Sequence, residues 1–316
     1  MIVKPKNLLH FLLTLPTEQA CIDYLEQCRW NGNITSPYDS TAKVWKLSDG
    51  YYRCSRTKKR FNVKTGTVLK HTKIPLLDWL WSLYHFLSKK GISSCQLARN
   101  IDFTQTTTWN LLKDIRKNLD QSNFVKEKLK GVTEIDETLV GGENGNRHWD
   151  KKVPGCQGRS CIDKTPILGM LEKGGYLVTR VTSDTKLTTL EPIIYEHVKE
   201  GATVNTDDWY KKSKLGKRYN HQMVNHSAKP KQYVKKDANG GKITTNSIEG
   251  VWSPFFKVTI NGTYHNNISD KYLQNYADEF TFRYNTRNYT ERDRFELALS
   301  AILGKKITYK EFELSI

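Results

Sequence analysis

The hydrophobic residues in the N-terminal part of the chain recur at helical spacing. The string LLHFLLTL predicts an amphipathic helix, which is too short and too broken by His10 and Thr14 to cross a membrane. Residues 74–91 show the same period, with a proline near the start and Gly91 as a stop. We therefore predict that residues 66–125 form a helical region.

A pair of short helices is predicted within this region. Ser93 or Ser94 can cap a helix over SCQLARNI, and Thr104 can cap a second, basic helix over QTTTWNLLKDIRK. This order is typical of a helix-turn-helix, which places its second helix in the major groove of DNA, and an ordinary helical hairpin is the alternative. The side chains that the second helix would present to DNA are Gln105, Thr107, Asn110 and Arg116.

From residue 131 onwards, strands and helices alternate. VTEIDETLV has the period of two that predicts a strand, and PILGMLE and GYLVTRVTSD predict two more strands joined by a turn at 173–175. A helix over LTTLEPIIYEHVKEG, a strand over TVNTD and a strand over HQMVNHS follow. NSIEGVWSPFFK begins a helix capped by Asn246 or Ser247, and SDKYLQNYADEFTFRYN forms the last long helix. This α/β order resembles a ribonuclease-H-like fold, a mixed sheet flanked by helices, over residues 126–316.

Composition adds the expectation of a polyanionic partner. The 316 residues exceed a typical single domain, and 37% hydrophobic residues suit a globular chain. Lys and Arg number 50 against 33 Asp and Glu, which gives a net charge of +17. This balance favours nucleic acid over an anionic membrane, because the chain has neither a lipidation motif nor an apolar run of about 20 residues. The six cysteines form no CxxC pair, which favours reduced thiols.

A stretch in the first 65 residues has the layout of a zinc ribbon without its ligands. A hairpin-like segment separates two pairs of positions, Ser36 with Asp39 and Cys54 with Thr57, and a zinc ribbon has Cys at all four. One thiolate, one carboxylate and two hydroxyls would make a poor tetrahedral site, so we expect no zinc. Residues 1–65 are thus predicted to be an N-terminal helix followed by a degenerate zinc-ribbon-like hairpin.

The second half of this hairpin is basic. Its cationic residues are Arg53, Arg56, Lys58, Lys59 and Arg60. They predict contacts with DNA phosphates, and a solvated basic surface is the alternative. We expect the packing of Trp45, Tyr51 and Phe61 to hold the hairpin together.

Three acidic residues fall where a ribonuclease-H-like fold needs carboxylates for a two-metal reaction. They are Asp136 in EIDET, Asp207 in VNTDDW and Glu249 in NSIEGVW. Oxygen ligands suit Mg²⁺ or Mn²⁺, and two such ions can activate a nucleophile and stabilise the leaving oxygen in phosphoryl transfer. Because side chains alternate along a strand, we expect Glu137 to point away from Asp136. Lone acids on a surface are the alternative.

Several linked strings resemble one family. EIDETLVGGENGNRH, NTDDWY, TTNSIEGVWSPFFK and YADEFTFRYNTRN, together with KKGISSCQLARNIDFTQTTTWNLLKDIR upstream, resemble the ISXO-type insertion-sequence transposases, whose eukaryotic relatives are called Merlin. The resemblance covers about residues 15 to 290. It implies a DDE transposase that binds terminal inverted repeats, hydrolyses a strand there and joins the freed 3′-hydroxyl to target DNA.

The resemblance also implies roles for single residues. Asp136 and Asp207 would be the first two metal ligands. The third would be Glu249 or Asn246, and we favour Glu249 because a carboxylate is the better Mg²⁺ ligand. Lys257 would contact DNA phosphate near the reacting end. Such enzymes act as multimers, so we expect at least a dimer on double-stranded DNA, in the cytoplasm or nucleoid of a bacterium or in a eukaryotic nucleus.

The chain also departs from the family pattern. Relatives place cysteines at both pairs of the hairpin, His where Thr244 stands, and often Lys-Arg where Lys257 and Val258 stand. The segment from Trp252 to Lys257 is one residue longer than expected and contains Pro254, which can kink a helix. These departures leave open a catalytically impaired or domesticated DNA-binding protein. An unrelated basic nuclease of the same fold is a third possibility.

Overall fold

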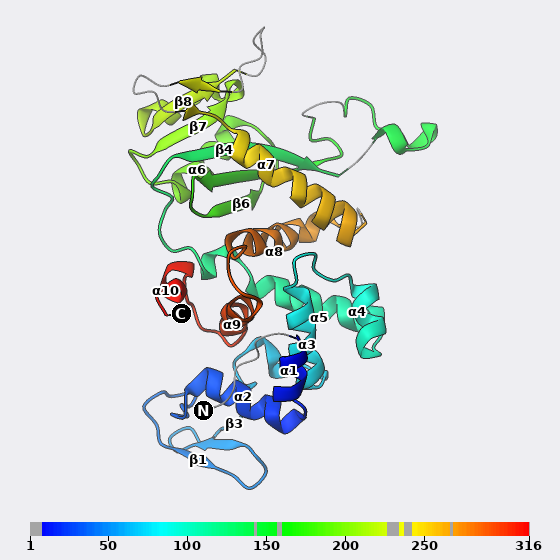
Figure 1. The fold of residues 1–316 in the computed structure, drawn as a ribbon, viewed down its shortest axis with the longest axis vertical. Coiled ribbons are helices and arrows are strands. Elements are labelled where there is room, and N and C mark those ends of the chain that lie inside the picture. Colours follow the sequence, from blue (N-terminus) through cyan, green and yellow to red (C-terminus); the bar gives the residue numbers. More distant parts are fainter. Residues whose placement is uncertain are drawn as a thin grey trace. The chain divides into compact units, whose positions relative to one another are not determined.

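A computed structural model describes residues 8–141, 144–156, 160–225, 234–236, 242–265 and 268–315. The chain divides into two compact units (Figure 1). The first unit contains Met1–Phe124 together with Asn288–Ile316, and the second contains Val125–Arg287. Residues after Arg287 therefore group with the N-terminal part, whereas the sequence placed them with the predicted catalytic domain.

The first unit is mainly helical. Its elements are α1 (Leu8–Thr14), α2 (Glu18–Trp30), η1 (Val68–His71), α3 (Leu76–Phe86), α4 (Ser94–Ile101), α5 (Gln105–Asn118), η2 (Gln121–Asn123), α9 (Glu291–Ile302) and α10 (Tyr309–Glu313). The predicted α3, α4 and α5 are confirmed, and so are two caps: Ser93 accepts from the Gln96 N–H and Thr104 from the Thr107 N–H.

Aromatic packing explains why α9 and α10 belong to the first unit. Phe295 of α9 packs edge-on against Phe11, with ring centroids 5.9 Å apart, and also contacts Tyr84. Tyr309 of α10 stacks on Phe124 at 5.3 Å. Burial of these rings stabilises the contact between segments that are far apart in the sequence.

The hairpin of the first unit is a three-stranded antiparallel sheet. Its strands are β1 (Val44–Lys46), β2 (Tyr52–Cys54) and β3 (Arg60–Phe61), in the order β1-β2-β3. Phe61 is buried and packs against Tyr52 and Trp30, with ring centroids 5.7 and 6.1 Å away. Of the three rings expected to hold the hairpin together by packing, Trp45 and Tyr51 do not join this buried cluster, because they are 49% and 39% exposed.

Hydrogen bonds connect the positions where a zinc ribbon has its cysteines. The buried thiol of Cys54 is hydrogen-bonded with the Ser36 and Thr57 side chains, and these bonds lower the pKa of the thiol to about 7. Asp39 instead accepts from Thr41 and forms an ion pair with Arg56 at 3.1 Å. The absence of zinc from this hairpin stays a prediction.

The second unit is built on a five-stranded mixed sheet. Its strands are β4 (Thr133–Val140), β5 (Thr165–Glu172), β6 (Leu177–Val181), β7 (Thr203–Asp207) and β8 (Asn220–Val224), in the order β6-β5-β4-β7-β8. β4, β5 and β6 pair antiparallel, whereas β7 runs parallel to β4 and β8. The predicted strands are confirmed. Two short strands, β9 (Lys235–Lys236) and β10 (Lys242–Ile243), form a separate ribbon.

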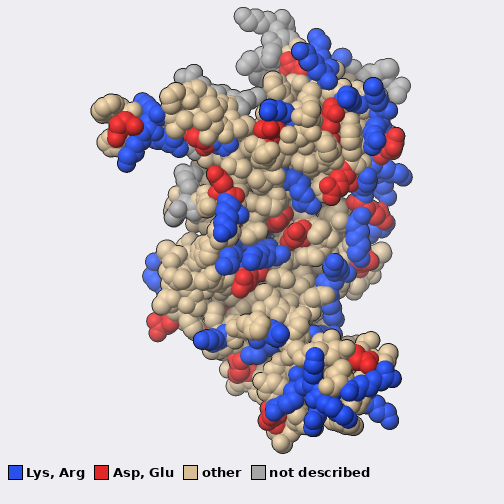
Figure 2. All heavy atoms as spheres, turned by 180° about the vertical axis from the view of Figure 1, so that it is seen from behind, with Lys and Arg blue, Asp and Glu red and all other residues tan. Residues whose placement is uncertain are grey.

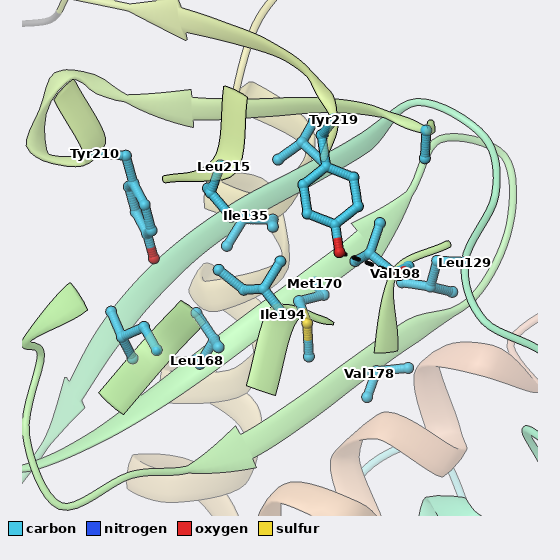
Figure 3. Close-up of a cluster of buried hydrophobic side chains, with 13 residues drawn as sticks. Leu129, Ile135, Leu168, Met170, Val178, Ile194, Val198, Tyr210, Leu215 and Tyr219 are labelled. Carbon is cyan, nitrogen blue, oxygen red and sulfur yellow. Dashed lines mark hydrogen bonds between the residues drawn. The ribbon is translucent and has the colours of Figure 1, made fainter. Parts of the chain in front are cut away.

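Helix α6 (Leu187–His197) covers one face of this sheet. Figure 3 shows the cluster between them, in which Ile135, Leu168 and Met170 of the sheet meet Ile194 of α6. The other residues of β4 and β5 point to the opposite face because side chains alternate along a strand. Asp136 therefore lies on the face of the sheet opposite α6.

Helices α7 (Asn246–Pro254) and α8 (Leu273–Asn285) cover the opposite face. Ile167 and Leu171 of β5 pack there with Val251 of α7 and Ala277 of α8. Pro254 ends the α-helical part, and the chain continues as a π-helix, η7 (Phe255–Thr263). A π-helix has wider turns and accommodates an additional residue, which agrees with the longer spacing before Lys257. This α/β arrangement is compatible with a ribonuclease-H-like domain.

Candidate active site

Two of the predicted carboxylates lie at the same level on neighbouring strands. β4 and β7 pair in parallel, with Thr133 opposite Val204 and Glu134 opposite Asn205. The same register continued by two residues brings Asp136 level with Asp207, the last residue of β7. Paired residues of parallel strands direct their side chains to one face, so both carboxylates lie on the α7 face.

The third predicted carboxylate, Glu249, lies in the first turn of α7. Buried Glu134 of β4 fixes the start of this helix, because its carboxylate accepts hydrogen bonds from the backbone N–H groups of Ser247 and Ile248 at 2.8 and 3.0 Å. It also accepts from the Ser247 hydroxyl at 3.1 Å. The expectation that Asn246 or Ser247 caps the helix is therefore wrong, since the capping group comes from the sheet.

The electrostatics of Asp136 show that the other two carboxylates act on it. Partial burial raises the pKa of Asp136 to about 6, and the negative charges of Asp207 and Glu249 contribute to the increase. The Trp252 indole opposes it by donating from Nε1 to Asp136 Oδ2 at 3.0 Å. Asp136 of β4 thus lies within electrostatic range of Asp207 on β7 and of Glu249 on α7.

The three carboxylates are the type of ligand that a hard dication needs, but their oxygen atoms do not converge on one position. Asp207 Oδ1 accepts from the Trp209 N–H at 3.1 Å, and Glu249 Oε1 accepts from the Thr245 hydroxyl at 2.9 Å. In the part of the chain that the structure describes, no group of three His, Cys, Asp or Glu residues is close enough to hold a metal ion. Carboxylate oxygens fit Mg²⁺ or Mn²⁺, whose charge would offset the mutual repulsion of the acids.

Glu137 points away from this cluster, as its place on the strand predicted. Its carboxylate accepts a hydrogen bond from the buried Tyr210 hydroxyl on the α6 side of the sheet.

Asn246 lies three residues before Glu249 on α7, and both side chains are exposed. Both candidates for the third role therefore share one side of the helix.

The predicted DNA-contacting residues of the hairpin all lie at the surface. Lys and Arg side chains gather over this small sheet, at the lower end of the view in Figure 2. Arg56 and Arg60 form ion pairs with Asp39 and Asp49. Three cations lie over exposed aromatic rings: Lys58 over Trp45, Lys59 over Tyr38 and Arg60 over Tyr51.

The predicted base-reading residues of α5 differ in exposure. Gln105 is exposed and donates to the Ser94 hydroxyl at 2.9 Å, while Thr107 and Asn110 are partly buried. Arg116 is 2% exposed, with its guanidinium over the Phe86 ring. A guanidinium enclosed in this way is unavailable to DNA, so we leave Arg116 out of the proposed DNA-binding surface. Lys257 is exposed on η7.

Sequence reasoning missed two residues of the site. Glu134 stands two positions before Asp136 and therefore faces α7, and Trp252 stands three positions after Glu249 and therefore faces β4. The side-chain periodicity of the strand and of the helix could have indicated these two positions. Which partner each side chain meets could not be predicted, because it depends on how α7 crosses the sheet.

The raised pKa of Asp136 predicts a stability cost at neutral pH. A carboxyl whose pKa rises from 3.8 to about 6 on folding stabilises the folded state below pH 4, and this contribution is lost as the pH rises through 6. Asp136→Asn should therefore increase the free energy of unfolding of metal-free protein at pH 7.5 by on the order of 2 kcal/mol. Urea unfolding at pH 4.5, 6 and 7.5 measures this. An advantage that shrinks as the pH rises would contradict it.

A mixed sheet with three acids on β4, β7 and α7 is compatible with nucleases and transposases of the ribonuclease-H-like class. Residues 128–285, half of the chain, match the ISXO2-like transposase domain, and the chain belongs to that family. It is also 26% identical over 173 residues to an uncharacterized protein in transposable element ISH50 of Halobacterium salinarum. That similarity covers 51% of this chain and 57% of the relative.

Both comparisons confirm the resemblance to insertion-sequence transposases. Among the described residues, no helix is long and apolar enough to span a bilayer.

Proposed function

We propose that the protein is a DNA transposase that binds the terminal inverted repeats of its own element, cleaves a strand there and transfers the end to target DNA. The observation that carries the proposal is the position of Asp136, level with Asp207 on the neighbouring strand and within reach of the charge of Glu249, in a domain of the transposase family. Two-metal phosphoryl transfer needs hard oxygen ligands from separate elements, and these three acids come from β4, β7 and α7.

In this proposal, Asp136, Asp207 and Glu249 hold Mg²⁺ or Mn²⁺. Bound ions would supply the positive charge that activates a water or a 3′-hydroxyl and stabilises the leaving oxygen. The chain contributes the positions: β4 and β7 set the spacing of the two aspartates, and Glu134 anchors the first turn of α7, which carries Glu249.

DNA binding is assigned to two parts of the first unit. The α4–α5 pair is proposed as the helix-turn-helix, with Gln105, Thr107 and Asn110 toward the bases. The basic hairpin is proposed to contact phosphates, and Lys257 of the second unit to contact the backbone near the reacting end. Enzymes of this class bring two ends together as multimers, so we propose that the protein works as a homo-oligomer on DNA.

Cleavage of a labelled duplex that carries the element's own end tests the proposal. We expect cuts at the end that require Mg²⁺ or Mn²⁺ and disappear with EDTA. Specific binding without any cut would contradict the enzymatic part and favour a transposase-derived DNA-binding protein. The altered zinc-ligand positions, now occupied by Ser36, Asp39 and Thr57, are the feature that favours this second candidate.

A further inference from the structure

Trp252 makes a contact that the proposed chemistry does not use directly. Its indole projects from α7 onto the sheet, is 7% exposed, and donates from Nε1 to Asp136 Oδ2 at 3.0 Å. Buried indole N–H groups need an acceptor, and a carboxylate forms a stronger, charge-assisted bond than a neutral acceptor. This large apolar side chain thus ends in a polar contact with a proposed metal ligand.

The neighbouring strand leaves room for this indole. Gly169 of β5 lies opposite Asp136 in the antiparallel register. A Cβ atom at position 169 would lie 2.5 and 2.7 Å from Cζ2 and Cη2 of Trp252, and 3.0 Å from Cδ1 of Ile248. These distances are shorter than ordinary van der Waals contact, and the two closest atoms belong to a rigid ring. Glycine at this position therefore leaves the space that the Trp252 ring occupies beside Asp136.

The same contact joins two elements that carry proposed ligands. Asp136 lies on β4, and Trp252 lies one helical turn after Glu249 on α7. Glu134, two residues before Asp136, binds the N-terminus of α7 through two backbone N–H groups. The helix is thus fixed to β4 at two points, one on each side of Glu249 along the chain.

We propose that Trp252 is a positioning residue for the carboxylate cluster, and that Gly169 is the glycine that makes its position possible. This inference rests on the proposed function. The indole N–H holds one oxygen of Asp136 and fixes the carboxylate at the junction of strand and helix. The negative charges of Asp207 and Glu249 repel the Asp136 carboxylate. Without the indole N–H, this carboxylate would turn away from them. Partners that orient a metal ligand typically account for about 10- to 100-fold in metal affinity or activity.

Two variants remove the contact in different ways. Trp252→Phe deletes the N–H donor and keeps an aromatic ring in the core, whereas Gly169→Ala keeps the donor and displaces the ring. The matched control is Thr281→Val, because the Thr281 hydroxyl makes a buried hydrogen bond to Thr179 at 2.8 Å, between α8 and β6 of the same unit. It loses one buried hydrogen bond and leaves β4 and α7 untouched.

The first measurement is the concentration of Mn²⁺ that gives half of the thermal stabilisation in the absence of DNA. The second is cleavage of the end duplex, with kcat separated from KM. For Trp252→Phe and Gly169→Ala we expect the Mn²⁺ midpoint to rise or kcat to fall about 10- to 100-fold, with KM for DNA nearly unchanged. Thr281→Val should lower the melting temperature and leave both values within about twofold of wild type.

Two outcomes would overturn the inference. One is a Trp252→Phe protein with the Mn²⁺ midpoint and kcat of wild type, and the other is an equal change in Thr281→Val. Asp136→Asn separates this failure from failure of the proposed function. If wild type cuts, Asp136→Asn does not, and Trp252→Phe cuts normally, only the positioning role is wrong. If wild type does not cut, the Mn²⁺ midpoint of Trp252→Phe is compared with those of wild type and Asp136→Asn. This comparison still decides whether Trp252 acts on the carboxylates.

Discussion

Asp136→Asn should reduce metal-dependent cleavage of the end duplex by at least about 10³-fold at pH 7.5. The carboxylate lies level with Asp207 on the neighbouring strand and within electrostatic range of Glu249, so its charge belongs to the set that would hold the ions. An amide is uncharged and a poorer Mg²⁺ ligand than a carboxylate, and loss of several kcal/mol of transition-state stabilisation corresponds to this factor. The measurement is single-turnover cutting under saturating protein, with DNA binding followed separately. Binding should persist.

Glu137→Gln is the matched control for this result. It removes the same charge from the adjacent position of β4, but its side chain bonds Tyr210 on the opposite face of the sheet. The glutamine oxygen can still accept from the tyrosine, so cutting should stay within a few-fold of wild type. Equal losses in Asp136→Asn and Glu137→Gln would contradict the assignment, because they would show sensitivity to β4 as a whole.

The third ligand can be assigned with the same assay. Glu249 and Asn246 lie on one side of α7, and the charge of Glu249 acts on Asp136. We expect Glu249→Gln to lose cutting as Asp136→Asn does, and Asn246→Ala to retain most of it. The reverse order would assign the third role to Asn246.

The parts of the fold that could be predicted are those set by local sequence. Ser93 and Thr104 cap α4 and α5 as predicted, since a cap needs only a hydroxyl and the next turn. The alternation in EIDET placed Asp136 and Glu137 on opposite faces. The cap of α7 could not be predicted in this way, because Glu134 is separated from Ser247 by 113 residues.

Aromatic residues were harder to place than caps. Trp45, Tyr51 and Phe61 share one hairpin and similar hydrophobicity, yet only Phe61 is buried. The difference arises because α2 presents Trp30 to one side of the small sheet, and the sequence of the hairpin does not contain that information. On the other side, Trp45 and Tyr51 lie beneath Lys58 and Arg60. Tertiary contacts therefore decided which rings form a core and which form a cationic surface.

Replacing Arg53, Lys58 and Lys59 together by alanine should weaken binding to end DNA and make it less dependent on salt. All three are exposed, Arg53 on β2 and the two lysines in the connection between β2 and β3. Arg56 and Arg60 are left in place, because their ion pairs with Asp39 and Asp49 support the hairpin. Each phosphate contact releases counterions, so the slope of log K against log salt should fall by about one for each cation removed. Filter binding or anisotropy between 50 and 200 mM salt measures the slope.

A second triple variant tests whether position or total charge decides the result. Lys173, Lys199 and Lys217 are exposed and lie where β5 ends or shortly before β7 and β8 begin. β5 runs antiparallel to β4, so these positions lie at the end of the sheet where β4 and β7 begin. Asp207 and the proposed reacting end lie at the opposite end of the strands. Their replacement by alanine removes the same charge from the +17 of the chain and should leave the slope nearly unchanged. Equal effects of both variants would mean that net charge alone attracts the DNA, and the hairpin would then have no assigned role in binding.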